Sequence, residues 1–162
     1  MALRVRDATA ADAAAIGLVA RAAWRDTYAG LLEAATIEAF VEAAYTVQRL
    51  ERRIDRHVVL VAEDDGRIIA LADALPEADR LSLVAIYAEP DRRGEGAGTM
   101  LLGTLRARFP DRPVVADVLT GNRKGEVFYE RRGFVPREAF EEDLFGEQVA
   151  ERRWWLDATL DP

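Results

Sequence analysis

The chain has 162 residues, of which 50% are apolar and 31% charged, with a formal net charge of −7 and no cysteine. This composition is typical of one globular domain, expected over residues 1–162, and it excludes disulfides and thiolate metal sites. The acidic balance argues against general nucleic-acid binding, which depends on cations that neutralise phosphates. The apolar runs are far shorter than the ~18 residues of a membrane span, and the chain starts without a hydrophobic signal segment. We therefore expect a cytoplasmic protein with neither a membrane nor a nucleic-acid partner.

The first third of the chain predicts a strand followed by helices. Apolar and polar residues alternate over the first segment, and Thr9 is placed to cap a following helix, with Asp12 three residues further on. Gly30 then interrupts the helical pattern. The predicted elements are a strand at residues 3–7, a helix at 10–26 and a second helix at 36–45, whose continuation through Arg53 the pattern leaves open.

From residue 58 the apolar period becomes that of strands. Asp65-Gly66 is a strong hairpin turn signal between two of them, and Pro90 and Gly133 are expected to end a strand and a helix. The predicted strands are residues 58–63, 67–75, 81–88, 114–120, 134–140 and 149–157, with helices at 97–109 and 123–132. This order predicts a mixed sheet with helices on both faces, in an α/β or α+β layered fold.

A glycine-rich segment, Arg93-Gly94-Glu95-Gly96-Ala97-Gly98-Thr99, joins a predicted strand to a predicted helix. Glycines permit positive φ and leave no Cβ between the backbone and a ligand. Because the first amides of a helix have no internal partner, they can bind an anion, and Arg93 adds positive charge. The segment matches neither the G-x-G-x-x-G dinucleotide fingerprint nor the Gly-Lys-Ser/Thr of a P-loop. By itself it indicates phosphate binding, with a flexible turn as the alternative.

Two motifs carry a family resemblance. Residues 93–98 resemble the R/Q-x-x-G-x-G/A signature of the GCN5-related N-acetyltransferase (GNAT) superfamily, and residues 122–134 resemble its N-x-x-A-x-x-F-Y-x-x-x-G-F motif. The one departure is Gly125 in place of alanine, which we expect to loosen that helix without touching a functional contact. Residues 24–28 are also similar to an acceptor-side segment of many such enzymes. The resemblance covers nearly the whole chain and implies a central mixed, mostly antiparallel sheet of six to seven strands.

The resemblance implies an N-acetyltransferase that uses acetyl-CoA as its co-substrate and no metal. Backbone amides of residues 94–99 would hold the CoA pyrophosphate, and the end of the strand at 86–88 would bond the pantetheine arm. Asn122 would contact the pantetheine or its neighbouring backbone. Tyr129 would lie near the thioester sulfur. The residues expected to bind the co-substrate are Ile86, Tyr87, Ala88, Arg93, Gly94, Glu95, Gly96, Ala97, Gly98, Thr99 and Asn122.

The residue types present in the chain restrict the possible mechanisms of acetyl transfer. A tyrosine with a pKa near 10 is protonated at neutral pH and can donate a proton to a leaving thiolate, so Tyr129 is the candidate general acid. The alternative is that it is a core aromatic residue. The chain has no cysteine for an acyl-enzyme, and its only histidine, His57, has no nucleophile motif nearby, so we interpret it as an ordinary surface or strand-end residue. Direct attack by the amine in a ternary complex is therefore favoured.

The sequence indicates less clearly which residues bind the acceptor amine and which group takes its proton. Trp24 and Tyr28 lie four residues apart on one predicted helix face, which fits either core packing or an acceptor pocket. The general base is open: Asp73, Asp117, Glu33 and a chain of waters are all candidates. The expected acceptor is a primary amine on a small molecule, or a protein N-terminus or lysine. A non-catalytic acyl-CoA-binding or sensing module is the alternative function, and a homodimer is compatible with the fold.

Overall fold

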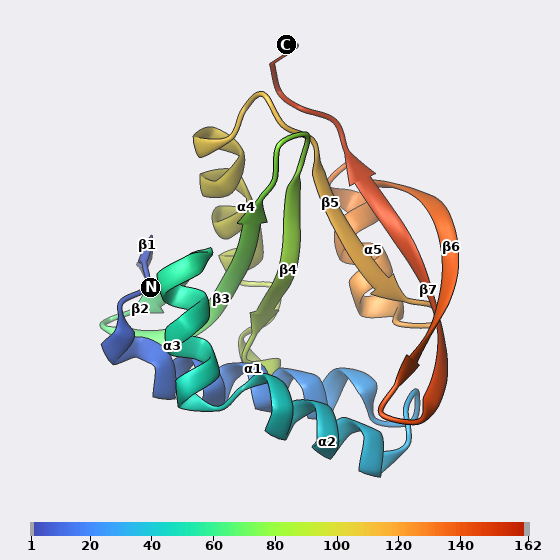
Figure 1. Ribbon diagram of the computed structural model, residues 1–162. Coiled ribbons are helices and arrows are strands. Elements are labelled where there is room, and N and C mark those ends of the chain that lie inside the picture. The colour runs from blue at the N-terminus through green and yellow to red at the C-terminus, as the bar shows by residue number, and fades with distance from the viewer. Residues whose placement is uncertain (1, 161–162) are drawn as a thin grey trace.

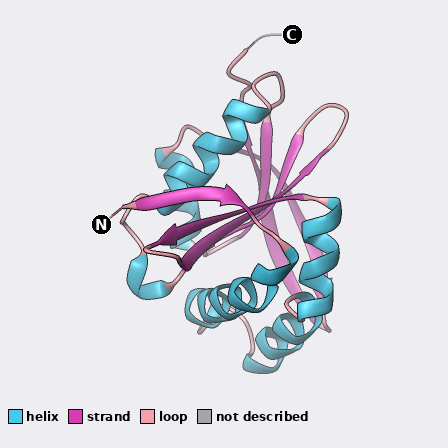
Figure 2. Ribbon diagram, turned by 90° about the vertical axis from the view of Figure 1, so that its left-hand side faces the viewer, coloured by secondary structure: helices cyan, strands magenta, loops and turns pink. Residues whose placement is uncertain are grey.

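The computed structural model describes residues 2–160, and it contains a seven-stranded sheet with helices on both faces (Figures 1 and 2). Along the sheet the strands run in the order β1-β2-β3-β4-β5-β7-β6, and every neighbouring pair is antiparallel except β4 and β5. The predicted mixed, mostly antiparallel sheet is therefore confirmed. The strands are β1 (Leu3–Asp7), β2 (Val58–Asp64), β3 (Arg67–Pro76), β4 (Leu81–Ala88), β5 (Val114–Leu119), β6 (Val135–Leu144) and β7 (Glu147–Leu156).

The helices form two layers. One layer consists of α1 (Ala13–Tyr28), α2 (Ala34–Ala44) and α3 (Val47–Arg56), and the other of α4 (Ala97–Arg108) and α5 (Arg123–Arg131). Each layer buries its own apolar cluster against the sheet, with α1 to α3 on one face and α4 with α5 on the other. Short 3-10 turns, η1 (Ala10–Asp12) and η2 (Pro90–Arg92), precede α1 and follow β4. No helix in the described part of the chain is long and apolar enough to cross a membrane.

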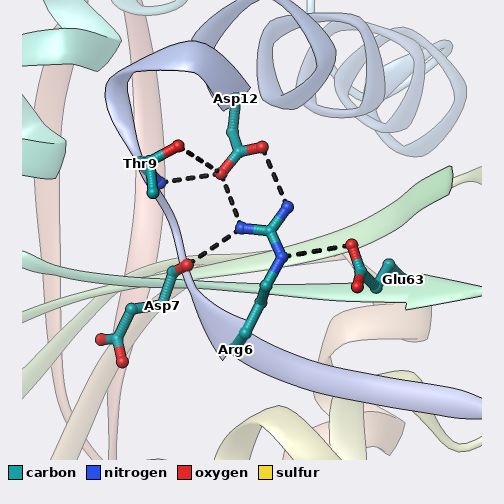
Figure 3. Close-up of polar contacts among 5 residues, drawn as sticks. All are labelled: Arg6, Asp7, Thr9, Asp12 and Glu63. Carbon is teal, nitrogen blue, oxygen red and sulfur yellow. Dashed lines mark hydrogen bonds and ion pairs between the residues drawn. The ribbon is translucent and has the colours of Figure 1, made fainter. Parts of the chain in front are cut away.

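Arg6 fixes the edge strand β1 to its surroundings (Figure 3). Its guanidinium donates to the carboxylate of Asp12 at 2.8 and 3.0 Å and to that of Glu63 on β2 at 3.1 Å. The hydrogen bonds from Arg6 lower the pKa of Asp12 to about 2, because they favour the ionised carboxylate. Asp12 also accepts the backbone N–H of Thr9 at 2.7 Å. The predicted helix start is thus present, although residues 10–12 form a separate 3-10 turn before α1.

Two further boundaries differ from the prediction. Helix α1 runs two residues beyond its predicted end, and Gly30, with φ 83°, lies in the loop that follows. The predicted second helix does not continue: α2 ends at Ala44, and the Thr46 side chain accepts the Arg49 amide at 3.2 Å to start α3 anew.

The sheet opens between β4 and β5. These strands pair only at Leu81 with Val114 and at Ser82 with Val115, so residues 83–88 of β4 have no ladder partner on that side. On its other edge, β5 pairs along its whole length with β7. The two strands therefore diverge toward the end of β4 that leads into the glycine loop, and this divergence positions the site.

Candidate functional site

A pocket of about 520 Å³ lies where β4 and β5 diverge. Its walls come from β4, the glycine loop, the first turn of α4, the end of β5 and the inner face of α5, and its size is that of a small-molecule site. The predicted residues that line it are Ile86, Tyr87, Ala88, Arg93, Gly94, Gly96, Ala97, Gly98, Thr99, Asn122 and Tyr129. Glu95 is the exception, because its carboxylate accepts from Arg92 at 2.8 Å and it does not line the pocket.

The backbone conformation of the glycine loop requires glycine at two positions. Gly94 has φ 82° and Gly96 has φ 93°, values that residues with a side chain rarely adopt, and Gly96 is the N-cap of α4. The first amides of α4 have no intrahelical carbonyl to bind, and the helix dipole places positive potential at the same end. The mouth of the pocket therefore offers backbone donors to an anion.

Gly98 serves the packing of α4 against α5 and not the backbone conformation of the loop. A Cβ built on it would lie 2.7 Å from Cε2 of Phe128 on α5, so only glycine allows the first turn of α4 to approach α5 this closely. The Phe128 ring cannot easily yield, because the Arg132 guanidinium lies 3.6 Å from the ring centroid. Arg132 in turn donates to the Thr99 hydroxyl at 2.6 Å and to the Phe128 carbonyl at 2.8 Å.

Cations gather around this mouth, although the whole chain is acidic. Two of them share one anion: both Arg93 and Lys124 bind the Asp26 carboxylate at the end of α1. Another, Arg92, pairs with Asp64 and Glu95. A basic patch inside an acidic protein creates a local attraction for anionic ligands. The cations that line the pocket are Arg92, Arg93, Lys124, Arg131 and Arg132.

Three tyrosines, Tyr28, Tyr87 and Tyr129, line the inner part of the pocket. Tyr129 is 9% exposed, and burial raises its pKa, so its hydroxyl stays protonated through the neutral range. Burial also raises the pKa of Tyr87, and hydrogen bonds with Tyr45 and Trp24 oppose that rise; the Trp24 indole N–H donates to the Tyr87 hydroxyl at 2.9 Å. The pocket therefore holds neutral phenols rather than phenolates.

The Asn122 side chain links the pocket wall to α5 through hydrogen bonds. Its side-chain oxygen accepts the Gly125 amide at 3.0 Å, and a hydrogen bond from Asn122 opposes the rise that burial causes in the pKa of Tyr28. A Cβ at residue 125 would lie 2.6 Å from the Asn122 amide nitrogen. Glycine at 125 therefore leaves more room for the Asn122 side chain than alanine would, and the expectation that it touches no functional contact stays a prediction.

The predicted acceptor residues separate into two groups. Tyr28 and Asp117 line the pocket, and Asp117 is also paired with Arg153 at 2.8 Å. Trp24 does not line it: the side chain is 5% exposed and stacks on Phe40 with ring centroids 3.9 Å apart. Core packing is therefore the arrangement found for Trp24, which touches the pocket wall through its hydrogen bond to Tyr87 and its ring contact with Tyr28.

Asp73 and Glu33 also lie outside the pocket lining. The Asp73 carboxylate, 2% exposed, lies 2.7 Å from Nδ1 of His57 and 3.8 Å from Arg53. Burial raises the pKa of Asp73 and the hydrogen bond with His57 opposes that rise. His57 lies at a strand end as predicted, directly before β2, but it is not an ordinary surface residue, because it partners a buried carboxylate. An aspartate within the apolar run of β3 was the available signal, since a buried carboxylate needs a partner.

Sequence reasoning missed about half of the pocket wall. Some of these residues, including Gly125 and Phe128, lie within the second motif but have no predicted binding role. The missed residues meet because α1, α4 and α5 pack beside the open edge of β4. They are Ala23, Thr27, Leu83, Val84, Ala85, Arg92, Val118, Lys124, Gly125, Val127, Phe128, Arg131 and Arg132. Residues 2–160 contain no group of three or more His, Asp or Glu side chains arranged to hold a metal ion.

Comparison with known proteins gives a family match. The model of the acetyltransferase (GNAT) domain family matches residues 55–136. A PaiA N-acetyltransferase from Thermoplasma acidophilum, solved in complex with coenzyme A, is 24% identical, with a TM-score of 0.79 over 94% of this chain and 98% of that one. A GCN5-related N-acetyltransferase from Rhodopseudomonas palustris is 21% identical, with a TM-score of 0.82 over 97% and 96%. No curated protein matches by sequence. At these identities the solved structures establish a shared fold.

Proposed function

The chain belongs to the acetyltransferase (GNAT) domain family, and we propose that it transfers an acetyl group from acetyl-CoA to a primary amine by direct attack in a ternary complex. The observation that carries this proposal is the continuity of the pocket. It runs from the glycine N-terminus of α4, past the unpaired edge of β4, to the buried hydroxyl-bearing ring of Tyr129. We propose that residues 1–162 form one such acyltransferase domain.

The residues present fit coenzyme A. Gly94 and Gly96 adopt the positive φ that turns the loop around an anion, and cations flank the mouth. The backbone amides of residues 94–99 would hold the pyrophosphate. Glu89 donates to Ile69 of β3, so the alternation of the strand turns the N–H and C=O groups of Ile86 and Ala88 to the β5 side, where they face no strand and can hydrogen-bond the amides of the pantetheine arm. Asn122 closes the far wall.

The chemistry requires a stabilised carbonyl oxygen and a proton for the leaving sulfur. The free backbone N–H groups of β4 are the donors best placed for the negative charge that develops on that oxygen. Tyr129 supplies the proton to the thiolate, because burial keeps its hydroxyl protonated. Of the carboxylates considered as proton acceptors for the amine, only Asp117 lines the pocket, where it or an ordered water takes the proton.

An assay for free thiol tests this proposal. The purified protein is incubated with acetyl-CoA and a panel of amines that includes small primary amines, polyamines and peptides with free N-termini or lysines. Amine-dependent thiol release with matching acetylated product is the expected result. If coenzyme A binds but no amine in a broad panel is acetylated, the protein is a coenzyme-binding or sensing module instead. If coenzyme A does not bind at all, both functions are excluded.

A further inference from the structure

Asp26 links three elements at the mouth of the pocket. It lies near the end of α1, and its Oδ2 atom accepts from both Nη1 of Arg93 in the glycine loop and Nζ of Lys124, which lies 3.2 Å away at the start of α5. Both cations line the pocket, whereas Asp26 does not. The hydrogen bonds from these two cations lower the pKa of Asp26, so its carboxylate is ionised throughout the neutral range.

Arg93 commits both ends of its guanidinium to α1. While Nη1 contacts Asp26, Nη2 donates to the Thr27 hydroxyl at 3.1 Å. Arginine binds a phosphate best through two parallel N–H donors of this fork. A phosphate that engaged Arg93 in that way would use at least one of the nitrogens that already contact α1, and it would bring a second negative charge close to Asp26.

We propose that Asp26 is an internal competitor for the phosphates of the coenzyme, which must displace its carboxylate from Arg93 and Lys124 to bind. This inference rests on the proposed use of coenzyme A. The Asp26 side chain is 42% exposed and that of Lys124 64%, so the Asp26 carboxylate stays accessible to water after it separates from Lys124. Asp26 thus sets the affinity for phosphorylated ligands by acting on two cations, and it takes no part in the chemical step.

The same exchange connects the coenzyme to the acceptor side of the pocket. Asp26 and Thr27 belong to the last turn of α1, which also carries Tyr28 against the pocket. Releasing Arg93 and Lys124 removes three polar contacts of this turn with the glycine loop and α5, while the hydrogen bond between Tyr28 and Asn122 remains. Binding of the phosphates therefore loosens the turn that presents Tyr28.

Isothermal titration of coenzyme A into wild type and Asp26→Asn tests the competition. Exposed ion pairs contribute modestly, so we expect the Kd for coenzyme A to fall about three- to tenfold in the variant. Pantetheine, which has no phosphate, should bind both proteins equally. Higher salt should reduce the difference for coenzyme A, because screening weakens exposed pairs. Asp26→Glu keeps the charge and should retain the weaker, wild-type-like affinity.

Asp7→Asn is the matched control, because Asp7 forms an exposed, two-bond pair with Arg108, and neither residue lines the pocket. It should leave both affinities unchanged. Equal or weaker binding of coenzyme A by Asp26→Asn overturns the inference, and so does an equal gain for pantetheine. If the wild type does not bind coenzyme A, the proposed function fails instead.

Discussion

Tyr129 enters the pocket from α5 with its ring held between two phenylalanines. Its centroid lies 5.2 Å from that of Phe128 and 4.9 Å from that of Phe134, in edge-on arrangements. Packing of this kind fixes the ring, while the pocket lining gives the residue access to a ligand. The motif alone could not separate a general acid from a core aromatic residue, and the structure shows a buried ring that also faces the pocket.

At this scale we predict the effect of Tyr129→Phe. Removing the proton donor should lower kcat about 100-fold, a typical share for general acid catalysis, and should change the Kd for coenzyme A less than threefold. Tyr45→Phe is the control, since it removes another buried hydroxyl from a residue that does not line the pocket. Steady-state kinetics and titration separate the two effects; unchanged turnover in Tyr129→Phe would remove the assigned role.

At the scale of elements, the contact between α4 and α5 shapes the site. Gly98 packs against Phe128 at this contact, and the Arg132 guanidinium lies over the Phe128 ring. Both helices supply pocket residues, so their spacing sets the width of the mouth. The glycine at residue 98 therefore serves packing, while those at 94 and 96 serve backbone conformation.

We predict opposite effects for two glycine-to-alanine changes on α4. Gly98→Ala should lower the free energy of unfolding by about 1–2 kcal/mol, because the new methyl group overpacks the contact with Phe128, and should weaken binding of coenzyme A. Gly103→Ala, at an exposed position with open space around it, should raise that free energy by up to ~1 kcal/mol through helix propensity. Urea denaturation measures both. A gain in stability for both variants would contradict this prediction, because it would show that the α4–α5 contact accommodates the added methyl group.

At the scale of the whole molecule, the C-terminal hairpin brings carboxylates together across the sheet. Glu151 on β7 lies opposite Leu119 of β5 and Phe140 of β6. Burial, followed by the neighbouring carboxylates of Glu142 and Asp117, raises the pKa of Glu151 to about 8. The protein therefore holds a neutral glutamic acid in this part of the sheet at neutral pH.

This predicts a stability that falls with rising pH. The unfolded chain ionises Glu151 near its ordinary value of 4.5, whereas the folded chain keeps it protonated up to about 8. The stabilisation is complete below the lower value, declines between the two and is lost above the higher one. Denaturation at pH 5 to 9 should show this decline in wild type and a flatter curve in Glu151→Gln. Glu130→Gln, exposed on α5, is the control; parallel curves for all three proteins would contradict the assignment.

The sequence by itself determined the order of the elements, their approximate bounds and the residues of the two motifs. These depend on apolar periodicity, turn chemistry and capping, which act between residues a few positions apart. Strand β4 begins and ends where predicted, and α4 starts at the predicted residue. Even among these local features, the sequence pattern leaves open whether α3 begins as a separate helix after Thr46, because a single capping hydrogen bond marks that start.

Only the tertiary structure decided which side chains meet. Asp26 contacts two residues that lie 67 and 98 positions away in the chain, and His57 contacts the buried carboxylate of Asp73 across 16 positions. The opening between β4 and β5 likewise involves strands far apart in the chain, because β5 pairs with β4 at only two positions while β7 pairs along its other edge. Such contacts depend on how the layers pack and on charges that must find partners once water is excluded. Local patterns in the chain do not encode them directly.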